Sequence, residues 1–442
     1  MVPRLVEGLT AHGVGNRHDL PLPFGFVVLG ACVVLVLSFG ALALWRAEPS
    51  APERAGRTAP RWLVSLLDNA LVRGLLAGAA GVLTLVTVLA LLVGSDGTSN
   101  PAPYVVFVWL WIGLPFLSLL FGPVWRVLNP LRWVQRGLSR VAQVDPRVGV
   151  VPYPTWLGYR PAAVGLLAFT WLELVQPDRT SRPVLMGWVL VVVVVTLPVS
   201  LVLGDVWFHR GDPFGVASDL YGALAPLGRR ADGTWTAKGP ISGLAHVVPA
   251  PGLLATVSVM LGSTAYDGFQ GNLAWTTYVQ TSGAPVVLQT LGLVGFVLLV
   301  ALTTTTACVV AARLAGQPVR GVATAFAPSL VPIAAGYVVA HYWSLLVFGG
   351  QVTWGLLSDP FGTGANYLGT AGLHPSTVLI APTLTACIQV VAIIAGHVLG
   401  IVAAHDRALR LFDRRVAVVG QVPLLIVMVG YTVGGLVLLF SA

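Results

Sequence analysis

Long apolar stretches, separated by short polar loops, form the main pattern along this chain. About 20 consecutive apolar residues in a helix cross the hydrocarbon core of a bilayer. Lipid offers no partner to unpaired backbone groups, so helices are the expected spanning element. The sequence therefore predicts an all-α, polytopic integral membrane helix bundle of about ten transmembrane helices. The predicted spans are roughly 22–45, 74–95, 104–122, 161–176, 183–204, 242–264, 285–313, 321–348, 376–403 and 416–440.

The composition supports the same class. Hydrophobic residues make up 56% of the 442 residues, charged residues only 10%, and the mean hydropathy is +0.83. A soluble fold could not cover so much apolar surface, so the lipid bilayer is the expected partner of most side chains. We expect a short extracytoplasmic N-terminal segment over residues 1–21 and a single transmembrane helical domain over 22–442.

Positive charge is distributed unevenly between the loops. The formal net charge is +8, the isoelectric point is about 9.8, and Lys238 is the only lysine. Most arginines fall in alternate loops, which predicts that these loops face the cytoplasm. Both termini and the loop 349–374 then face outward, in a multi-pass protein of the bacterial cytoplasmic membrane. Topology explains the basic charge, so we expect no nucleic acid partner. The arginine-rich loops are 46–73, 123–160, 205–240 and 404–415.

Two of these loops open with similar sequences, which predicts a tandem repeat of a two-helix unit. Gly122-Pro123-Val124-Trp125 leads to Asn129-Pro130, and Gly204-Asp205-Val206-Trp207 leads to Asp212-Pro213. An Asn or Asp before Pro caps a following helix, and each loop continues into a segment that could lie on the membrane surface. Each unit then returns through an apolar span that ends near an acidic residue. Chance similarity between two loops is the alternative.

Several ionisable residues lie at membrane depth, where they are costly and often functional. Glu173 and His341 are both expected in the outer half of their spans, and Asp267 ends the second repeat unit. A carboxylate and an imidazole at similar depth could bind a cation or relay a proton. We therefore predict that Glu173 and His341 face one polar cavity. Alternatively, Arg179 or Arg182 pairs with Glu173, and His341 bonds locally.

Other polar residues within the spans are weaker candidates for substrate or ion binding. Thr304 and Thr305 belong to a run of four threonines, and His397 lies eight residues before His405. The eight-residue spacing separates the two histidines by about 12 Å along a helix, too far for one metal ion. The sequence contains no haem-attachment, Walker A, dinucleotide-binding or serine-hydrolase motif. It predicts no metal site and leaves any cofactor open.

Several segments together resemble a known family over nearly the whole chain. They are Ala11-His12-Gly13-Val14-Gly15 with Asp19-Leu20-Pro21, Trp171-Leu172-Glu173-Leu174, Ala340-His341-Tyr342, and Gly396-His397 through Ala404-His405-Asp406-Arg407. These segments resemble a family of bacterial, largely actinobacterial, polytopic membrane proteins often labelled fenitrothion hydrolase. The label implies hydrolysis of organophosphates. Hydrolases of that class usually hold one or two metals in a cluster of histidines and carboxylates, and this sequence has no such spacing.

Three function classes remain open from the sequence. A transporter or permease for a small solute or ion leads, because broken helices and parallel repeats are ways in which transporters build a central site. Pro328, Pro332 and Pro382 lie within predicted spans and free backbone carbonyls there. A membrane-embedded hydrolase is the alternative that the family label implies. A non-catalytic subunit, with partners in a membrane-protein complex, is the third.

Overall fold

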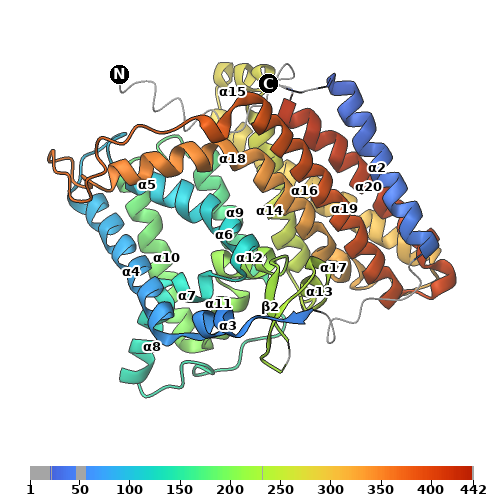
Figure 1. Cartoon of the computed structure of the whole chain (residues 1–442), viewed down its shortest axis with the longest axis horizontal. Coiled ribbons are helices and arrows are strands. Elements are labelled where there is room, and N and C mark those ends of the chain that lie inside the picture. The colour runs from blue at the N-terminus through green and yellow to red at the C-terminus, as the bar shows by residue number, and fades with distance from the viewer. Residues whose placement is uncertain (1–19, 21, 46–55, 231, 441–442) are drawn as a thin grey trace.

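The computed structural model describes residues 20, 22–45, 56–230 and 232–440, and this part of the chain is helical apart from one small sheet (Figure 1). The long helices are α2 (Phe24–Trp45), α4 (Ala70–Val93), α10 (Arg182–Leu203), α14 (Leu253–Gln270), α16 (Pro285–Leu314), α18 (Val331–Leu356), α19 (Pro382–Leu411) and α20 (Arg414–Phe440). The all-α membrane class predicted from the sequence is confirmed. The predicted N-terminal segment 1–21 lies outside the described residues apart from Leu20.

Shorter elements connect and interrupt these helices. The strands are β1 (Arg57–Thr58), β2 (Leu227–Arg229) and β3 (Trp235–Ala237). The helices are α3 (Arg61–Asp68), α5 (Ala102–Tyr104), α6 (Leu114–Phe121), α7 (Trp125–Leu128), α8 (Pro130–Val141), α9 (Arg160–Leu174), α11 (Val206–Arg210), α12 (Pro213–Gly222), α13 (Pro240–Ala245), α15 (Leu273–Thr281) and α17 (Val322–Phe326). A π-helix, η3 (Val105–Gly113), and two 3₁₀ turns, η4 (Ala327–Leu330) and η5 (Val378–Ile380), complete the set.

Eight helical segments of the described chain are long and apolar enough to cross a membrane. They correspond to eight of the predicted spans. The other two predicted spans are α9, with 15 residues, and α14, with 18 residues, and both carry polar side chains. The predicted start of the span 242–264 is wrong, because the corresponding helix α14 begins at Leu253. Pro249 and Pro251 interrupt the stretch before it, since proline disfavours a helical residue ahead of it and lacks an N–H donor.

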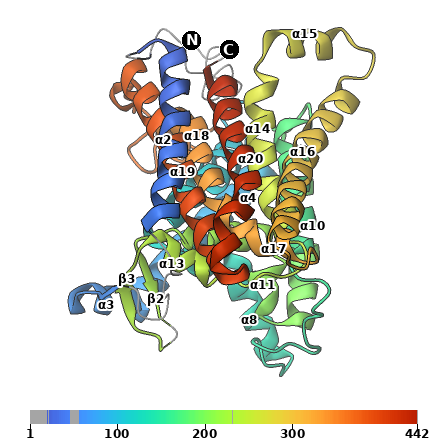
Figure 2. The same cartoon turned by 90° about the vertical axis from the view of Figure 1, so that its right-hand side faces the viewer.

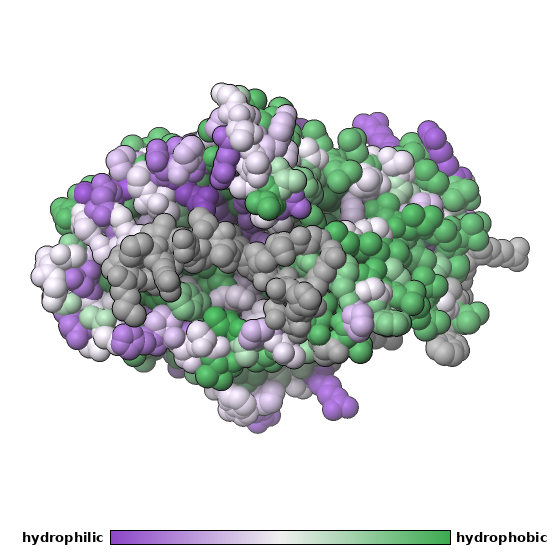
Figure 3. Space-filling model, turned by 90° about the horizontal axis from the view of Figure 1, so that it is seen from above, coloured by the Kyte–Doolittle hydropathy of each residue, from purple (hydrophilic) through white to green (hydrophobic). Residues whose placement is uncertain are grey.

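Both ends of the helical domain lie at the same face of the bundle (Figures 1 and 2). The rings of Phe24, which opens α2, and Phe440, which closes α20, have centroids 6.0 Å apart. Seen from this face, hydrophilic side chains gather over the middle and one end, and apolar ones cover the end where α2 and α20 lie (Figure 3).

The arginine-rich loops meet at the opposite face. Strand β1 from the loop before α4 pairs with β3, and β3 pairs with β2, so that residues more than 160 positions apart form one antiparallel sheet. Arg229 forms an ion pair with Asp68 beside this sheet. These contacts place the described parts of the loops 46–73 and 205–240 on one face, and the cytoplasmic location of that face stays a prediction.

Arg182 lies on the face opposite the arginine-rich loops, where the sequence pattern predicts little positive charge. Its Nε donates to the Leu91 carbonyl at 2.9 Å and its Nη2 to the Leu92 carbonyl at 2.6 Å. These carbonyls end α4 and have no partner within that helix, so the cation caps its C-terminus. Arg182 is therefore a structural cap, which explains why it departs from the charge pattern.

The middle of the bundle is formed by α18. In the span that contains it, 78% of the most apolar 18-residue stretch is buried inside the protein, against 11% in the spans of α2 and α16. Helix α19 packs closely against it. A Cβ added at Gly336 would lie 2.4 Å from the Ala392 carbonyl oxygen, and one at Gly396 would lie 2.6 Å from the Pro332 carbonyl oxygen. Only glycine permits this approach, which fixes the position of α18.

The two similar loops adopt matching local structures. Gly122 and Gly204 end α6 and α10 with φ of 87° and 68° and the same ψ of −163°. Asn129 and Asp212 then cap α8 and α12 by accepting from the backbone N–H two residues ahead. The prediction of a membrane-surface helix is wrong for α12, which is largely buried, because it packs against α6 and α9. Superposition of the whole two-helix units stays a prediction.

Candidate functional site

A carboxylate and an imidazole bond to each other inside the bundle. Asp267, from α14, is 5% exposed, and His341, from α18, is 2% exposed. The His341 Nε2 donates to Asp267 Oδ2 across 2.9 Å. Asp267 Oδ1 accepts a second bond from the Gln270 amide at 2.8 Å. Both oxygens of this carboxylate are thus held by donors, an arrangement that favours its charged form.

Glu173 joins this pair from a third helix. It is the second-last residue of α9 and is 3% exposed. Its side chain interacts electrostatically with Asp267 and Arg179, but no ion pair within 4 Å links it to any described arginine. The Oε2 atom of Glu173 is buried and has no hydrogen-bond partner among the described residues. The negative end of the α9 dipole adds to the cost of a charge there, and among the described residues only Arg179 is close enough to offset it in part.

Aromatic rings enclose the three ionisable side chains. The Tyr337 ring is parallel to the His341 ring, with 6.1 Å between the ring centroids. The Tyr342 ring meets the His341 ring edge-on, with 4.7 Å between the centroids. The Tyr342 hydroxyl interacts with both Asp267 and Glu173. The buried hydroxyl of Tyr337 approaches α14 at Gly268, where an added Cβ would be only 3.0 Å away. Glycine at this position therefore allows the tyrosine to lie beside the carboxylate.

A small cavity borders this site. It measures about 10 Å³ and is lined by Trp111, Thr264 and Tyr342 among others, which is space on the scale of one water molecule. Trp111 comes from η3, a π-helix of nine residues. Such widened turns recur at functional sites because they change the direction in which side chains project. The site thus has room for water.

The remaining candidates lie elsewhere. Thr304 bonds to the Tyr431 hydroxyl at 3.3 Å, and Thr305 donates to the Ala301 carbonyl one turn back in its own helix. His397 donates through Nδ1 to the Ile393 carbonyl at 2.8 Å, and its buried Nε2 has no partner among the described residues. His405 bonds to Gln421. The structure therefore brings together Glu173, Asp267 and His341, and leaves the threonines and His397 in separate packing contacts.

The sequence did not indicate a second polar centre that joins the two loop motifs. Asp212 Oδ2 accepts from Trp125 Nε1 at 3.0 Å and from Asn129 Nδ2 at 2.9 Å. Burial raises the pKa of Asp212 to about 6, and this effect exceeds that of the hydrogen bond from Trp125, which lowers the pKa. Arg132 binds Asp205 through two nitrogens, at 3.0 and 2.6 Å. The sequence indicates that Asn129 and Asp212 cap helices, but it does not indicate that the two side chains contact each other.

Among the described residues, no group of three or more His, Cys, Asp or Glu side chains is arranged to hold a metal ion. His341 and Asp267 supply two suitable ligand types, and structural and catalytic zinc sites need at least three protein ligands.

Comparisons with known proteins add no further assignment. No family model matches this chain, and neither a curated protein nor a solved structure is similar enough to count as a match.

Proposed function

We propose that this protein is a transporter that moves protons through Glu173, Asp267 and His341. One observation carries the proposal. Glu173 holds a buried carboxylate oxygen without a hydrogen-bond partner, next to a carboxylate that is already bonded to a histidine. An unpaired charge at such a position costs several kcal/mol, and binding a proton removes that cost.

The size of the site favours the proton over other cations. A sodium or calcium ion needs about six oxygen ligands around it, whereas the adjoining cavity has the volume of about one water molecule. A proton needs no such space. Glu173 would accept the proton, and the Asp267–His341 pair would receive it through the intervening hydroxyl of Tyr342 or a water.

The three helices that carry these residues also suit alternating access. Glu173 and Asp267 end equivalent helices of the two predicted repeat units, and His341 belongs to the central helix α18. Sites between repeats are typical of transporters, which expose them to either side by moving one unit against another. Arginine asymmetry further supports a bacterial cytoplasmic membrane location with both termini outside.

A membrane-embedded hydrolase is the second candidate, and the Asp267–His341 pair favours it. An acid that orients a histidine is the general-base half of many nucleophilic sites. The resemblance to the fenitrothion hydrolase family supports the same activity. A hydrolase also needs a nucleophile or metal-bound water and room for its substrate, and the adjoining cavity measures about 10 Å³.

Reconstitution distinguishes these functions. The purified protein is inserted in liposomes that contain a pH-sensitive dye, and a potassium gradient with valinomycin imposes an inside-negative potential. Inward proton flux above that of empty liposomes is expected, and His341→Ala should abolish it. The matched control is His374→Ala, because His374 lies exposed in the loop before α19. Flux equal to that of empty liposomes contradicts the proposal, and organophosphate hydrolysis that requires His341 would support the hydrolase instead.

A further inference from the structure

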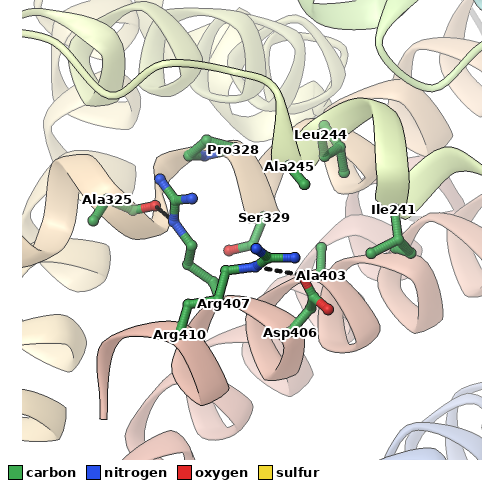
Figure 4. A pocket seen from close by; sticks show the side chains of 10 residues that line it. All are labelled: Ile241, Leu244, Ala245, Ala325, Pro328, Ser329, Ala403, Asp406, Arg407 and Arg410. Atoms are coloured by element: carbon green, nitrogen blue, oxygen red, sulfur yellow. Dashed lines mark hydrogen bonds and ion pairs between the residues drawn. The ribbon is translucent and has the colours of Figure 1, made fainter. Parts of the chain in front are cut away.

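A second pocket is lined by residues of α13, the α17–η4 segment and α19, none of which lines the central cavity (Figure 4). It measures about 20 Å³ and lies between α13, the α17–η4 segment and the last turns of α19. Its lining residues are Ile241, Leu244, Ala245, Ala325, Pro328, Ser329, Ala403, Asp406, Arg407 and Arg410. The pocket therefore combines an apolar wall from α13 with a charged wall from α19.

Two guanidinium groups point into this region from successive turns of α19 (Figure 4). Arg407 donates through Nε to the Ala325 carbonyl at 2.8 Å, a bond that fixes its side chain across the pocket. This bond uses one of its five N–H groups, and the described residues offer no other hydrogen bond or ion pair to Arg407. Its terminal nitrogens, which form the bidentate edge of a guanidinium, remain for a ligand.

The charges around the pocket do not balance. Arg410 pairs with Asp406, Nε to Oδ2, at 3.1 Å, and the Asp406 side chain is only 5% exposed. Among the described lining residues, Asp406 is the only carboxylate, whereas two arginines line the pocket. One positive charge therefore exceeds the negative charge in a partly enclosed site.

We propose that this pocket binds a phosphate-bearing anion through Arg407 and Arg410. The guanidinium fork matches the geometry of phosphate oxygens and is the usual protein group for their bidentate recognition. The pocket lies beside the last turns of α19, a helix long and apolar enough to cross a membrane, and Ile241, Leu244 and Pro328 offer an apolar wall for the start of an acyl chain. Basic pockets between helices on the cytoplasmic side are known to bind anionic headgroups. The anion could be such a headgroup or free phosphate.

Binding to the purified full chain in detergent tests this site. Native mass spectrometry measures the affinity for phosphatidylglycerol and for phosphatidylcholine, whose choline group cancels the phosphate charge. Arg407→Gln is expected to weaken phosphatidylglycerol binding about 10- to 100-fold, the effect of losing a charge-assisted bidentate contact. The matched control is Arg313→Gln, which removes an exposed arginine from the last turn of α16.

The outcomes separate the sources of the anion. If inorganic phosphate displaces phosphatidylglycerol from the wild type, the pocket takes soluble phosphate as well, and absence of competition assigns it to lipid. Equal phosphatidylglycerol affinity of the wild type and Arg407→Gln overturns the proposal, as does an equal loss in Arg313→Gln. Should Arg407→Gln fail to fold, Arg407→Lys replaces it. Loss of the planar fork is then expected to weaken binding about tenfold, and unchanged binding overturns the proposal.

Discussion

Asn129 and Asp212 occupy matching positions in two copies of one loop motif, and they hydrogen-bond to each other at 2.9 Å. At the other end of the same units, Glu173 and Asp267 both lie in the last turn of their helices and interact electrostatically. The two predicted repeat units thus contact each other at both ends. Contacts between equivalent positions are expected when two similar units pack around a local two-fold axis.

Removing the Asp212 carboxylate should destabilise the contact between the two units. Asp212→Ala leaves the buried donors of Trp125 and Asn129 without their acceptor. The expected loss is about 2–4 kcal/mol, since each unsatisfied buried group costs about 1–3 kcal/mol. Melting temperature in detergent measures it. Asp145→Ala, which changes an aspartate of the exposed loop after α8, should leave the melting temperature nearly unchanged.

The raised pKa of Asp212 predicts a specific pH dependence. Burial raises it from 3.8 to about 6, so the folded state binds this proton more tightly than the unfolded state. The contribution of Asp212 to stability is therefore full below pH 4 and is lost as the pH rises to about 6, by as much as about 3 kcal/mol. The melting temperature of the wild type, relative to that of Asp212→Asn, should fall across this interval. A constant difference between the two proteins contradicts the prediction.

The paired contact of Arg132 with Asp205 should be sensitive to the shape of the cation. Arg132 is 5% exposed and binds through two nitrogens, so Arg132→Lys loses one of two charge-assisted bonds. A loss of about 1–2 kcal/mol is expected. Arg140→Lys serves as the control because Arg140 is exposed on the same helix. Equal melting temperatures for the wild type and Arg132→Lys would show that the fork geometry is unimportant.

The close approach of α18 and α19 predicts that Gly336→Ala is destabilising. The added methyl group would meet the Ala392 carbonyl oxygen at 2.4 Å, and the helices would have to separate. Overpacking of this kind costs about 1–3 kcal/mol. Gly430→Ala is the control, because nothing lies within 4 Å of a Cβ at that position in α20. A melting temperature that falls equally in both variants would assign the effect to helix composition.

The arginine pattern predicts which face is cytoplasmic, and labelling from outside the cell can test it. Ser50→Cys and Thr363→Cys are introduced after the three native cysteines, Cys32, Cys308 and Cys387, have been replaced. A membrane-impermeant thiol reagent should label position 363 in intact cells and position 50 only after lysis. Labelling of both positions in intact cells would contradict the topology.

Hydropathy predicted which segments are long apolar helices. It did not predict which polar side chains from different helices contact each other. Hydropathy located eight spans, because a run of apolar residues needs no knowledge of the rest of the chain. The span predicted from 242 begins too early, because Pro249 and Pro251 prevent a continuous helix before Leu253 although the segment is apolar. The sequence also suggested that Glu173 and His341 share a cavity, whereas the bonded partner of His341 is Asp267, 74 positions away. The arrangement of helices in the bundle depends on close contacts such as that of Gly336 with Gly396. The hydrophobic pattern of the sequence does not predict these contacts.

Proton flux through Glu173→Gln tests the central claim most directly. Glutamine has nearly the same shape as glutamate but cannot bind and release a proton, so the protein should fold and insert while inward flux falls to the level of empty liposomes. Asp178→Asn is the matched control, because it neutralises an exposed carboxylate five residues further along the chain and should leave the flux unchanged. A Glu173→Gln protein that conducts protons as the wild type does would contradict the account.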